Sequence, residues 1–214
     1  MKRILLAVLL VSGFSVRADY RATEAYRSVV EAHYIQAGGT GLVDVAFRDA
    51  VVLFERVNLL DDVQAAYARM LGEGEKPEFV ITQETTNRWS YVNKSGHASV
   101  IEELHRAIQT NGNEAAVVYF TEGERFFGKF RAVIEVAVRP DEDGAASHYE
   151  VAVYAYPVNA FSRFFARHLG VVDRFFRDKT REITHLAVTI CRDLMEKDIP
   201  AADTASLLPD HQSL

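Results

Sequence analysis

Few side chains in this 214-residue chain have the type and spacing of a metal site. Glu102 and His105 stand three residues apart, so on a helix they could reach one metal ion together. A di-iron site needs that motif twice, and the sequence holds no second copy. His168 falls on an apolar stripe, where a histidine is usually a hydrogen-bonded core residue. We therefore expect neither a metal nor a cofactor.

Motifs for nucleophilic catalysis and phosphate binding are missing as well. The sequence has no G-x-S-x-G elbow, and its single cysteine, Cys191, falls on the apolar side of a predicted helix, where thiols are usually unreactive. The glycine-rich run 38–41 follows a predicted helix instead of opening one, which is the wrong context for a phosphate loop. The sequence favours a non-catalytic protein, with a hydrolase using scattered histidines and carboxylates as the weakest alternative.

Phenylalanines concentrate in the C-terminal third of the chain. The sequence SRFF at 162–165 recurs as DRFF at 173–176, and eleven residues are close to three helical turns, so both phenylalanine pairs are expected on one side of a helix. Rings that cover a sheet can also line an apolar cavity. The predicted ligand contacts are Phe126, Phe130, Tyr154, Tyr156, Phe161, Phe164, Phe165, His168, Phe175 and Phe176.

Basic residues accompany these rings. Between residues 160 and 181, six basic residues meet two acidic ones, within a protein of net charge −6. A basic face beside an aromatic face is typical of helices that lie on anionic membranes, and a solvated face is the ordinary alternative. The segment RFFGKFR at 125–131 is similar, and strand alternation would place Phe126, Gly128 and Phe130 on one face. The predicted anion or membrane contacts are Arg125, Lys129, Arg131, Arg163, Arg167, Arg174 and Arg177.

The spacing of apolar residues predicts the elements that position these groups. Helices are predicted at 20–36, ending at Gly38-Gly39, and at 59–71 and 99–108. Strands are predicted at 51–57, with a helix over 42–57 as the alternative, in a hairpin over 79–82 and 88–92, and at 115–121, 126–138 and 149–156. One long helix is predicted over 160–195, with Gly170 bending it without ending it.

This order indicates an α+β domain whose mainly antiparallel sheet is packed by a long C-terminal amphipathic helix. The segment Tyr149 to Met195, with a strand, Pro157 and the aromatic helix, resembles the START-like helix-grip proteins. That resemblance implies a curved sheet around a long helix and an apolar cavity. The helix expected at 99–108 departs from it, and it carries no functional residue to this chain.

The first eighteen residues have the pattern of an export signal. Lys2 and Arg3 precede an almost purely apolar run of eleven residues, and Ala18 ends a small-residue cleavage site. Removal of Lys2, Arg3 and Arg17 would leave 21 basic residues against 30 acidic ones, a net charge of −9 that disfavours nucleic acid as a partner. We expect residues 1–18 to be a signal peptide, 19–196 one domain and 197–214 a disordered tail, in a periplasmic or secreted protein.

Two functions fit these features best. The first is an exported, non-catalytic protein that binds an apolar or amphiphilic molecule, such as a lipid, between its sheet and the Phe-rich helix. The second is a cell-envelope protein that docks its basic helix on a membrane or on a protein partner.

Overall fold

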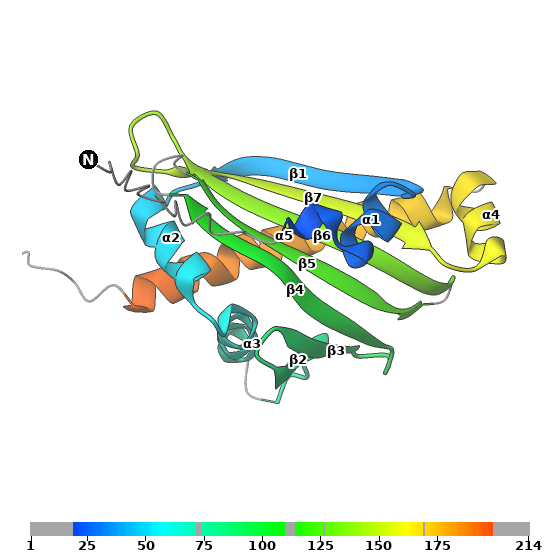
Figure 1. Cartoon of the computed structure of the whole chain (residues 1–214). Coiled ribbons are helices and arrows are strands. Elements are labelled where there is room, and N and C mark those ends of the chain that lie inside the picture. The colour runs from blue at the N-terminus through cyan, green and yellow to red at the C-terminus, as the bar shows by residue number, and fades with distance from the viewer. Residues whose placement is uncertain (1–18, 72–73, 110–113, 126, 169, 199–214) are drawn as a thin grey trace, which may run out of the picture.

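Seven strands in the described part of the chain form one antiparallel sheet, in the order β1-β7-β6-β5-β4-β3-β2 (Figure 1). The computed structural model describes residues 19–71, 74–109, 114–125, 127–168 and 170–198. The expected signal peptide and residues 199–214 of the expected tail lie outside these ranges. The strands are β1 (Ile35–Val43), β2 (Phe79–Thr85), β3 (Arg88–Asn93), β4 (Ala98–Gln109), β5 (Glu114–Arg125), β6 (Gly128–Pro140) and β7 (Ser147–Pro157).

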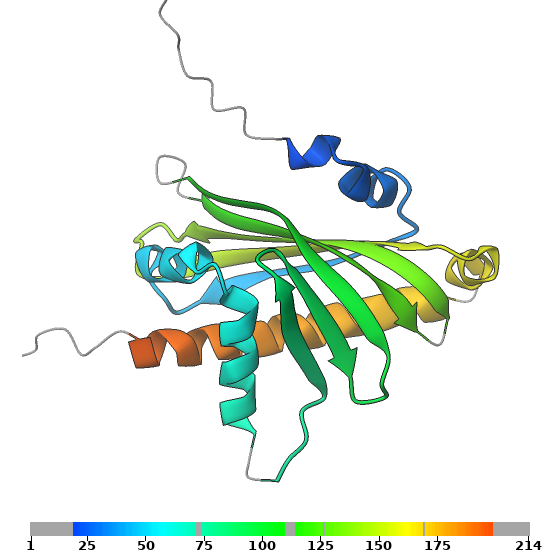
Figure 2. The same ribbon diagram turned by 60° about the horizontal axis from the view of Figure 1, so that its bottom comes forward.

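Helices lie on both faces of this sheet, with α1 on one side and α5 on the other (Figures 1 and 2). We call the face toward α5 the inner face and the face toward α1 the outer face. The helices are η1 (Tyr20–Ala22), α1 (Glu24–Val30), α2 (Phe47–Glu55), α3 (Leu59–Met70), α4 (Ala160–His168) and α5 (Val171–Asp198).

The N-terminal half of α5 packs on the inner face where β1, β7 and β6 meet. Val172 and Phe176 are buried there against a cluster that includes Ile35 and Phe130. Farther along, Ile190 and Leu194 pack against α3. Because α5 contacts both the first strand and a helix that precedes the second, it joins parts of the chain that are far apart in sequence.

An arginine on β4 fixes the end of α2. The Arg106 Nη1 atom donates hydrogen bonds to the carbonyl oxygens of Phe54 and Arg56, at 2.6 and 2.7 Å. Glu103 holds the same guanidinium, with its Oε1 accepting from Nε at 2.8 Å. This arrangement satisfies carbonyls that the end of a helix leaves without intrahelical partners.

Tyrosines attach α1 to the outer face. The Tyr26 hydroxyl donates to Glu135 Oε1 at 2.8 Å, and the Tyr20 ring stacks on His105 with centroids 4.4 Å apart. Burial, followed by the bond to Glu135, raises the pKa of Tyr26 well above its ordinary value. Val29 of α1 is also buried there, against Val118 and other residues of the outer face.

Side chains of α3 cover the free edge of β2. Gln64 Oε1 accepts a hydrogen bond from the Ile81 backbone amide at 2.9 Å, and the Tyr67 hydroxyl accepts one from the Glu78 amide at 3.2 Å. The Ile81 amide lies on β2, which is the last strand of the sheet, and Glu78 directly precedes this strand.

The expected fold class is confirmed: the protein is an α+β domain with an antiparallel sheet packed by a long C-terminal helix, the arrangement of the helix-grip fold. The predicted helix over 59–71, the hairpin and the three following strands are also found. Their register opposes Val133, Ile134 and Val136 on β6 to Tyr154, Val153 and Val151 on β7.

Two predicted elements have the opposite type. Residues 99–108 form strand β4, and a bulge between Glu103 and His105 shifts its alternation, so that apolar residues facing two covered sides imitate a helical period. Residues 51–55, predicted as strand, belong to α2, because Ala50, Leu53 and Phe54 are buried at helical spacing. The alternative prediction, a helix over 42–57, agrees better with α2 at Phe47–Glu55. It begins too early, because β1 extends to Val43.

Glycines account for the other errors. The helix predicted over 20–36 is the short α1, and Gly38 and Gly39 lie inside β1; a Cβ on Gly38 would come within 2.6 Å of the Val151 carbonyl oxygen. The long helix predicted over 160–195 is divided at Gly170, whose φ of +61° lies in the left-handed region that glycine tolerates. As a result, α4 and α5 run in different directions (Figure 2).

Phe164 and Phe176, which were predicted on one face of a single helix, test the division of that helix at Gly170. We expect Phe176→Ala to lower the free energy of unfolding by about 3 kcal/mol or more, since the ring is 7% exposed and its loss leaves a cavity. The matched change Phe164→Ala, at a ring that is 55% exposed, should cost less than about 0.5 kcal/mol. Urea denaturation measures both, and equal losses would contradict the division at Gly170.

Candidate ligand-binding site

A transverse row of residues crosses the inner face near one end of the sheet. Tyr91 on β3 is opposite Ser99 on β4, Ser99 is opposite Gly123 on β5, and Gly123 is opposite Phe130 on β6. Residues directly opposite in antiparallel strands point to the same face of the sheet. The row therefore has an aromatic ring at each end, Tyr91 and Phe130, with a serine and a glycine between them.

Aromatic rings continue the row beyond Tyr91. Phe79 on β2 stacks on Tyr91 with centroids 5.5 Å apart and planes at 18°. Tyr67 of α3 also stacks on Phe79, with centroids 4.6 Å apart and planes at 6°. Tyr67 is buried, whereas Phe79 and Tyr91 are half-buried. Three rings from three elements thus form one stack with an accessible middle.

Arg125 lies between the two aromatic parts of this row. Its guanidinium carbon is 5.7 Å from the centroid of Tyr91 and 5.4 Å from that of Phe130. The Nη2 atom donates to Ser99 Oγ at 3.0 Å, and Nη1 donates to the Glu124 carbonyl oxygen at 2.7 Å. Burial lowers the pKa of the guanidinium, which identifies a partly desolvated cation.

Gly123 leaves the room that this arrangement uses. A Cβ at position 123 would lie 2.2 Å from Ser99 Oγ and 2.9 Å from Ser99 Cβ. Ser99 is itself buried, so it has little freedom to move away. The absence of a side chain at Gly123 therefore lets the Arg125 guanidinium reach the serine opposite.

Helix α5 and the β5–β6 turn supply the wall beyond Phe130. Phe176 lies edge-on to Phe130 at 5.7 Å, and Phe127 contacts Phe175 and Phe176 at 5.4 and 5.8 Å. Farther along α5, Lys179 and Glu182 pair at 2.6 Å and are near enough to Tyr91 to act on its pKa, which burial raises. The residues Tyr67, Phe79, Tyr91, Ser99, Gly123, Arg125, Phe130 and Phe176 are called the inner-face site below.

Three of the predicted ligand contacts come together on the inner face, and others do not. Phe130, Phe175 and Phe176 meet there. Tyr154 and Tyr156 lie on the outer face beside α1, and Phe164 is on the surface. Phe126 lies outside the described residues, as do the side chains of Phe161, Phe165 and His168.

The predicted basic contacts are scattered. Arg125 belongs to the inner-face site, but Arg131 lies on the outer face with Glu122 at 3.7 Å. Arg163 donates to the Tyr156 hydroxyl at 2.7 Å, and Arg177 pairs with Asp173 at 2.8 Å. Lys129 and Arg174 are exposed, and the Arg167 side chain lies outside the described part.

The alternation predicted for segment 125–131 is wrong in one respect. Phe127 and Phe130, expected on opposite faces, are both buried in the same cluster. Gly128 has a φ of +100°, so the chain turns there and brings Phe127 back over the inner face. The Ser162 hydroxyl bonds to the Phe127 carbonyl oxygen and holds the turn against α4.

The Glu102 and His105 pair has no metal-site geometry. Both residues lie on strand β4, on either side of its bulge. Within the described ranges, no group of three or more His, Cys, Asp or Glu side chains is placed to hold a metal ion. Cys191 belongs to α5, and its side chain lies outside what the structure describes.

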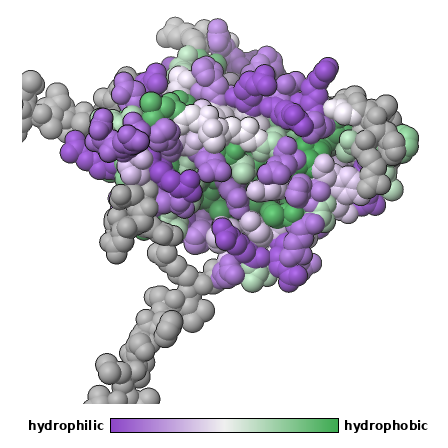
Figure 3. Space-filling model, turned by 90° about the horizontal axis from the view of Figure 1, so that it is seen from above, coloured by the Kyte–Doolittle hydropathy of each residue, from purple (hydrophilic) through white to green (hydrophobic). Residues whose placement is uncertain are grey.

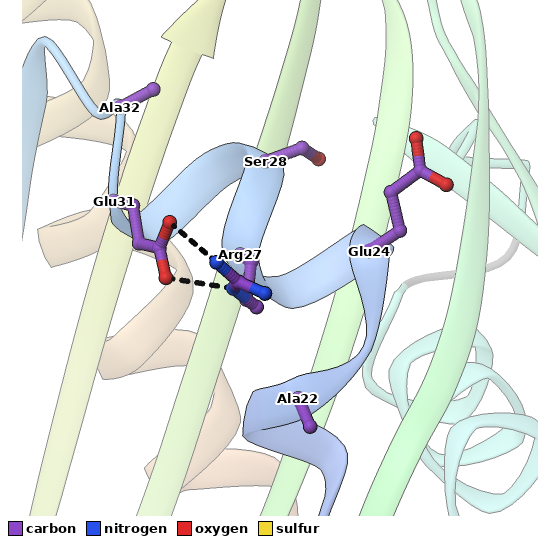
Figure 4. A pocket seen from close by; sticks show the side chains of 6 residues that line it. All are labelled: Ala22, Glu24, Arg27, Ser28, Glu31 and Ala32. Atoms are coloured by element: carbon purple, nitrogen blue, oxygen red, sulfur yellow. Dashed lines mark hydrogen bonds and ion pairs between the residues drawn. The ribbon is translucent and has the colours of Figure 1, made fainter.

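Two surface depressions lie elsewhere on the molecule. One, of about 550 Å³, is lined by α1 and its flanks, where Arg27 and Glu31 pair with each other (Figure 4). The other, of about 360 Å³, lies over β1, β6 and β7 between Thr40 and Arg139. Both are open to solvent and have short or mutually paired polar side chains, so neither has the walls of an apolar-ligand site.

The upper side of the molecule, as it is oriented in Figure 1, carries small apolar patches. Viewed from above, the molecule is largely hydrophilic, with pale and green areas interrupted by purple ones (Figure 3). Within the described ranges, no helix combines the length and apolarity needed to cross a membrane.

Sequence reasoning missed five residues of the inner-face site: Tyr67, Phe79, Tyr91, Ser99 and Gly123. Tyr91 was placed in the correct hairpin, but nothing showed which face it would take. Ser99 was assigned to a helix, which hid its pairing with β5. The usable signal was Gly123 itself, because a glycine within a strand often marks a close approach of another group.

Replacing Gly123 should disturb the site and the fold together. We expect Gly123→Ala to lower the free energy of unfolding by about 1–3 kcal/mol, because the new methyl group overlaps Ser99. Gly39→Ala is the matched control, since a Cβ there meets nothing within 4 Å. Adding Ser99→Gly to Gly123→Ala should recover part of the loss. Chemical denaturation of the four proteins checks this, and a neutral Gly123→Ala would contradict the contact.

Comparisons with known proteins give solved structures of low similarity. No family model matches the chain, and no curated protein does. A conserved protein from Geobacillus kaustophilus has 9% identity and a TM-score of 0.46 over 76% of this chain and 96% of its own. Hypothetical protein jhp0584 from Helicobacter pylori has 10% identity and a TM-score of 0.44 over 76% and 86%.

A third similar structure is norcoclaurine synthase from Thalictrum flavum in complex with dopamine and hydroxybenzaldehyde. It has 11% identity and a TM-score of 0.45 over 75% of this chain and 86% of its own. These values transfer no residue role and no activity to this chain. The assignment of the helix-grip arrangement rests on the strand order and on the packing of α5.

Proposed function

We propose that this protein is an exported, non-catalytic binder of a small amphiphilic molecule, held at the inner-face site between the sheet and α5. The observation that carries the proposal is the row of rings that is buried at both ends and half-buried in the middle. Tyr67 and Phe176 are buried ends, whereas Phe79 and Tyr91 keep accessible surface. Accessible rings between fixed neighbours give apolar contact area at a low cost in side-chain entropy.

The inner face supplies few groups for catalysis at this site. Its polar members are the hydroxyls of Ser99, Tyr91 and Tyr67 and the Arg125 guanidinium, and none of its eight residues is a histidine or carries a carboxylate. Arg125 bonds directly to Ser99, and a guanidinium is a poor general base because it keeps its proton. The chemistry of the row is therefore suited to holding a ligand more than to transforming it.

Native mass spectrometry tests the binding. The protein purified from the organism that makes it should show a reproducible added mass, of the size of a lipid or another small amphiphile, that is absent from the denatured spectrum. Tyr91→Glu should abolish the added mass because it places a charge in the middle of the row. Val92→Glu, one residue along β3 on the other face and 39% exposed, should retain it.

Two results would contradict the proposed binding. One is a bare mass for the wild-type protein together with no binding of added amphiphiles such as dodecanol. The other is an added mass that Tyr91→Glu keeps, with the fold intact by circular dichroism.

The export part of the proposal has its own test. If residues 1–18 are a signal peptide, the mature protein should begin at Asp19 and fractionate outside the cytoplasm. N-terminal sequencing of the purified protein and cell fractionation measure both. A protein that keeps Met1 or Lys2 and stays in the cytoplasm would exclude export while leaving the binding proposal in place.

A second candidate function follows from α4. Phe164 is 55% exposed next to Arg163, and Val158 just before the helix is 36% exposed, so this end of the molecule presents apolar and basic groups together. Docking of this helix on an anionic envelope membrane predicts salt-sensitive sedimentation with anionic liposomes. Replacement by Glu of Arg163 and Arg167 on α4, together with Arg174 and Arg177 in the first turns of α5, should abolish it.

A further inference from the structure

Arg125 differs from the other arginines of the sheet in lacking a carboxylate. The strands carry four more arginines, and each of them pairs with an acidic side chain: Arg88 with Glu84, Arg106 with Glu103, Arg131 with Glu122, and Arg139 with Glu114 and Glu150. Within the described part of the chain, Arg125 has a serine hydroxyl, a backbone carbonyl and two aromatic faces as partners.

The position of Arg125 makes the lack of a carboxylate partner unusual. Arg88, Arg131 and Arg139 pair near solvent, where a carboxylate adds little, yet they have one. Arg125 is half-buried on the inner face, and burial lowers the pKa of its guanidinium. A partly desolvated cation without a counterion is unfavourable, so an anion that entered the site would gain more there than at the surface.

Its surroundings hold the guanidinium in place for such an anion. The bond to Ser99 fixes one nitrogen, the bond to the Glu124 carbonyl oxygen fixes another, and the rings of Tyr91 and Phe130 flank the group. A guanidinium has five N–H donors, and these two bonds use two of them. Three donors remain, one each on Nε, Nη1 and Nη2, and neighbouring N–H groups of this planar fork can meet the two oxygens of a carboxylate.

Apolar contact area lies next to this fork. Tyr91, which flanks the guanidinium, is followed by the half-buried ring of Phe79 at 5.5 Å. A molecule with its carboxylate on Arg125 would therefore find its apolar part beside accessible rings. This combination of one cation and an adjoining aromatic surface matches an amphiphilic acid.

We propose that Arg125 binds the carboxylate of an amphiphilic acid whose apolar part lies on Tyr91 and Phe79. This inference rests on the proposed binding function and specifies the class of ligand. It makes Arg125 the residue that selects an acid over an uncharged molecule of the same shape. Ser99 and Gly123 are then positioning residues, because they hold the guanidinium without contacting the ligand.

A pair of probes that differ only in the headgroup tests this inference. Isothermal titration calorimetry of the wild-type protein should give a dodecanoate affinity about tenfold or more above that of dodecanol. In Arg125→Gln the preference should disappear through a loss of dodecanoate affinity, with the dodecanol affinity within about twofold of wild type. Arg131→Gln, on the outer face, should leave both affinities unchanged.

A second variant keeps the inference testable if Arg125→Gln fails to fold. Arg125→Lys keeps the charge without the planar fork, so it should retain a severalfold preference for dodecanoate. The inference is overturned if Arg125→Gln binds dodecanoate as tightly as wild type, or if wild type binds the two probes equally. Equal binding would still support the proposed function, whereas no binding of either probe would count against both.

Discussion

The packing of α5 against the inner face is the contact on which the rest of this structure depends. It brings Phe176 onto Phe130 and Val172 onto the strands around Ile35, and thereby secures the first strand of the chain against the last elements. Strand β1 has glycines at 38, 39 and 41, so it brings few side chains of its own to the core. Val172 and Phe176 of α5 are the helix residues that are buried against this part of the sheet.

The inner-face site results from this packing and from the absence of a side chain at Gly123. Phe130 is held from one side by α5, and Tyr91 is held from the other by Phe79 and Tyr67. Between them the sheet has Gly123, so the row contains a gap that no side chain of its own fills. A charged residue two positions along the same strand occupies that gap because an arginine is long enough to fold back and planar enough to lie between two rings.

The sequence predicted the outline of the fold better than the site. Elements with a regular apolar spacing, such as the helix at 59–70 and the strands from 115 to 157, were recognised. Strand β4 was not, because helices cover both faces of the sheet near it and a bulge shifts its alternation. Apolar residues on both sides of β4, offset by the bulge, give a spacing that resembles that of a helix.

The site itself required long-range register that local patterns do not contain. Arg125 and Phe130 were selected from composition, but Tyr91 and Ser99 become their neighbours only through the pairing of four strands. The division at Gly170 had a similar effect on the C-terminal rings, since one backbone angle decides whether Phe164 and Phe176 share a face. A glycine in a sequence permits such an angle, but the surrounding packing determines whether the chain adopts it.

The covering of strand β2 by α3 has a consequence for how copies of this protein meet. An open sheet ends in strands whose backbone groups can accept a strand from another molecule, and this is a common route to aggregation. At β2, Gln64 already bonds to the amide of Ile81, and Tyr67 bonds to the amide of Glu78 just before the strand, so an incoming strand would first have to displace α3. The same helix that contributes Tyr67 to the ring stack therefore also discourages edge-to-edge association, and a change that loosens it would expose the molecule to polymerisation through this edge.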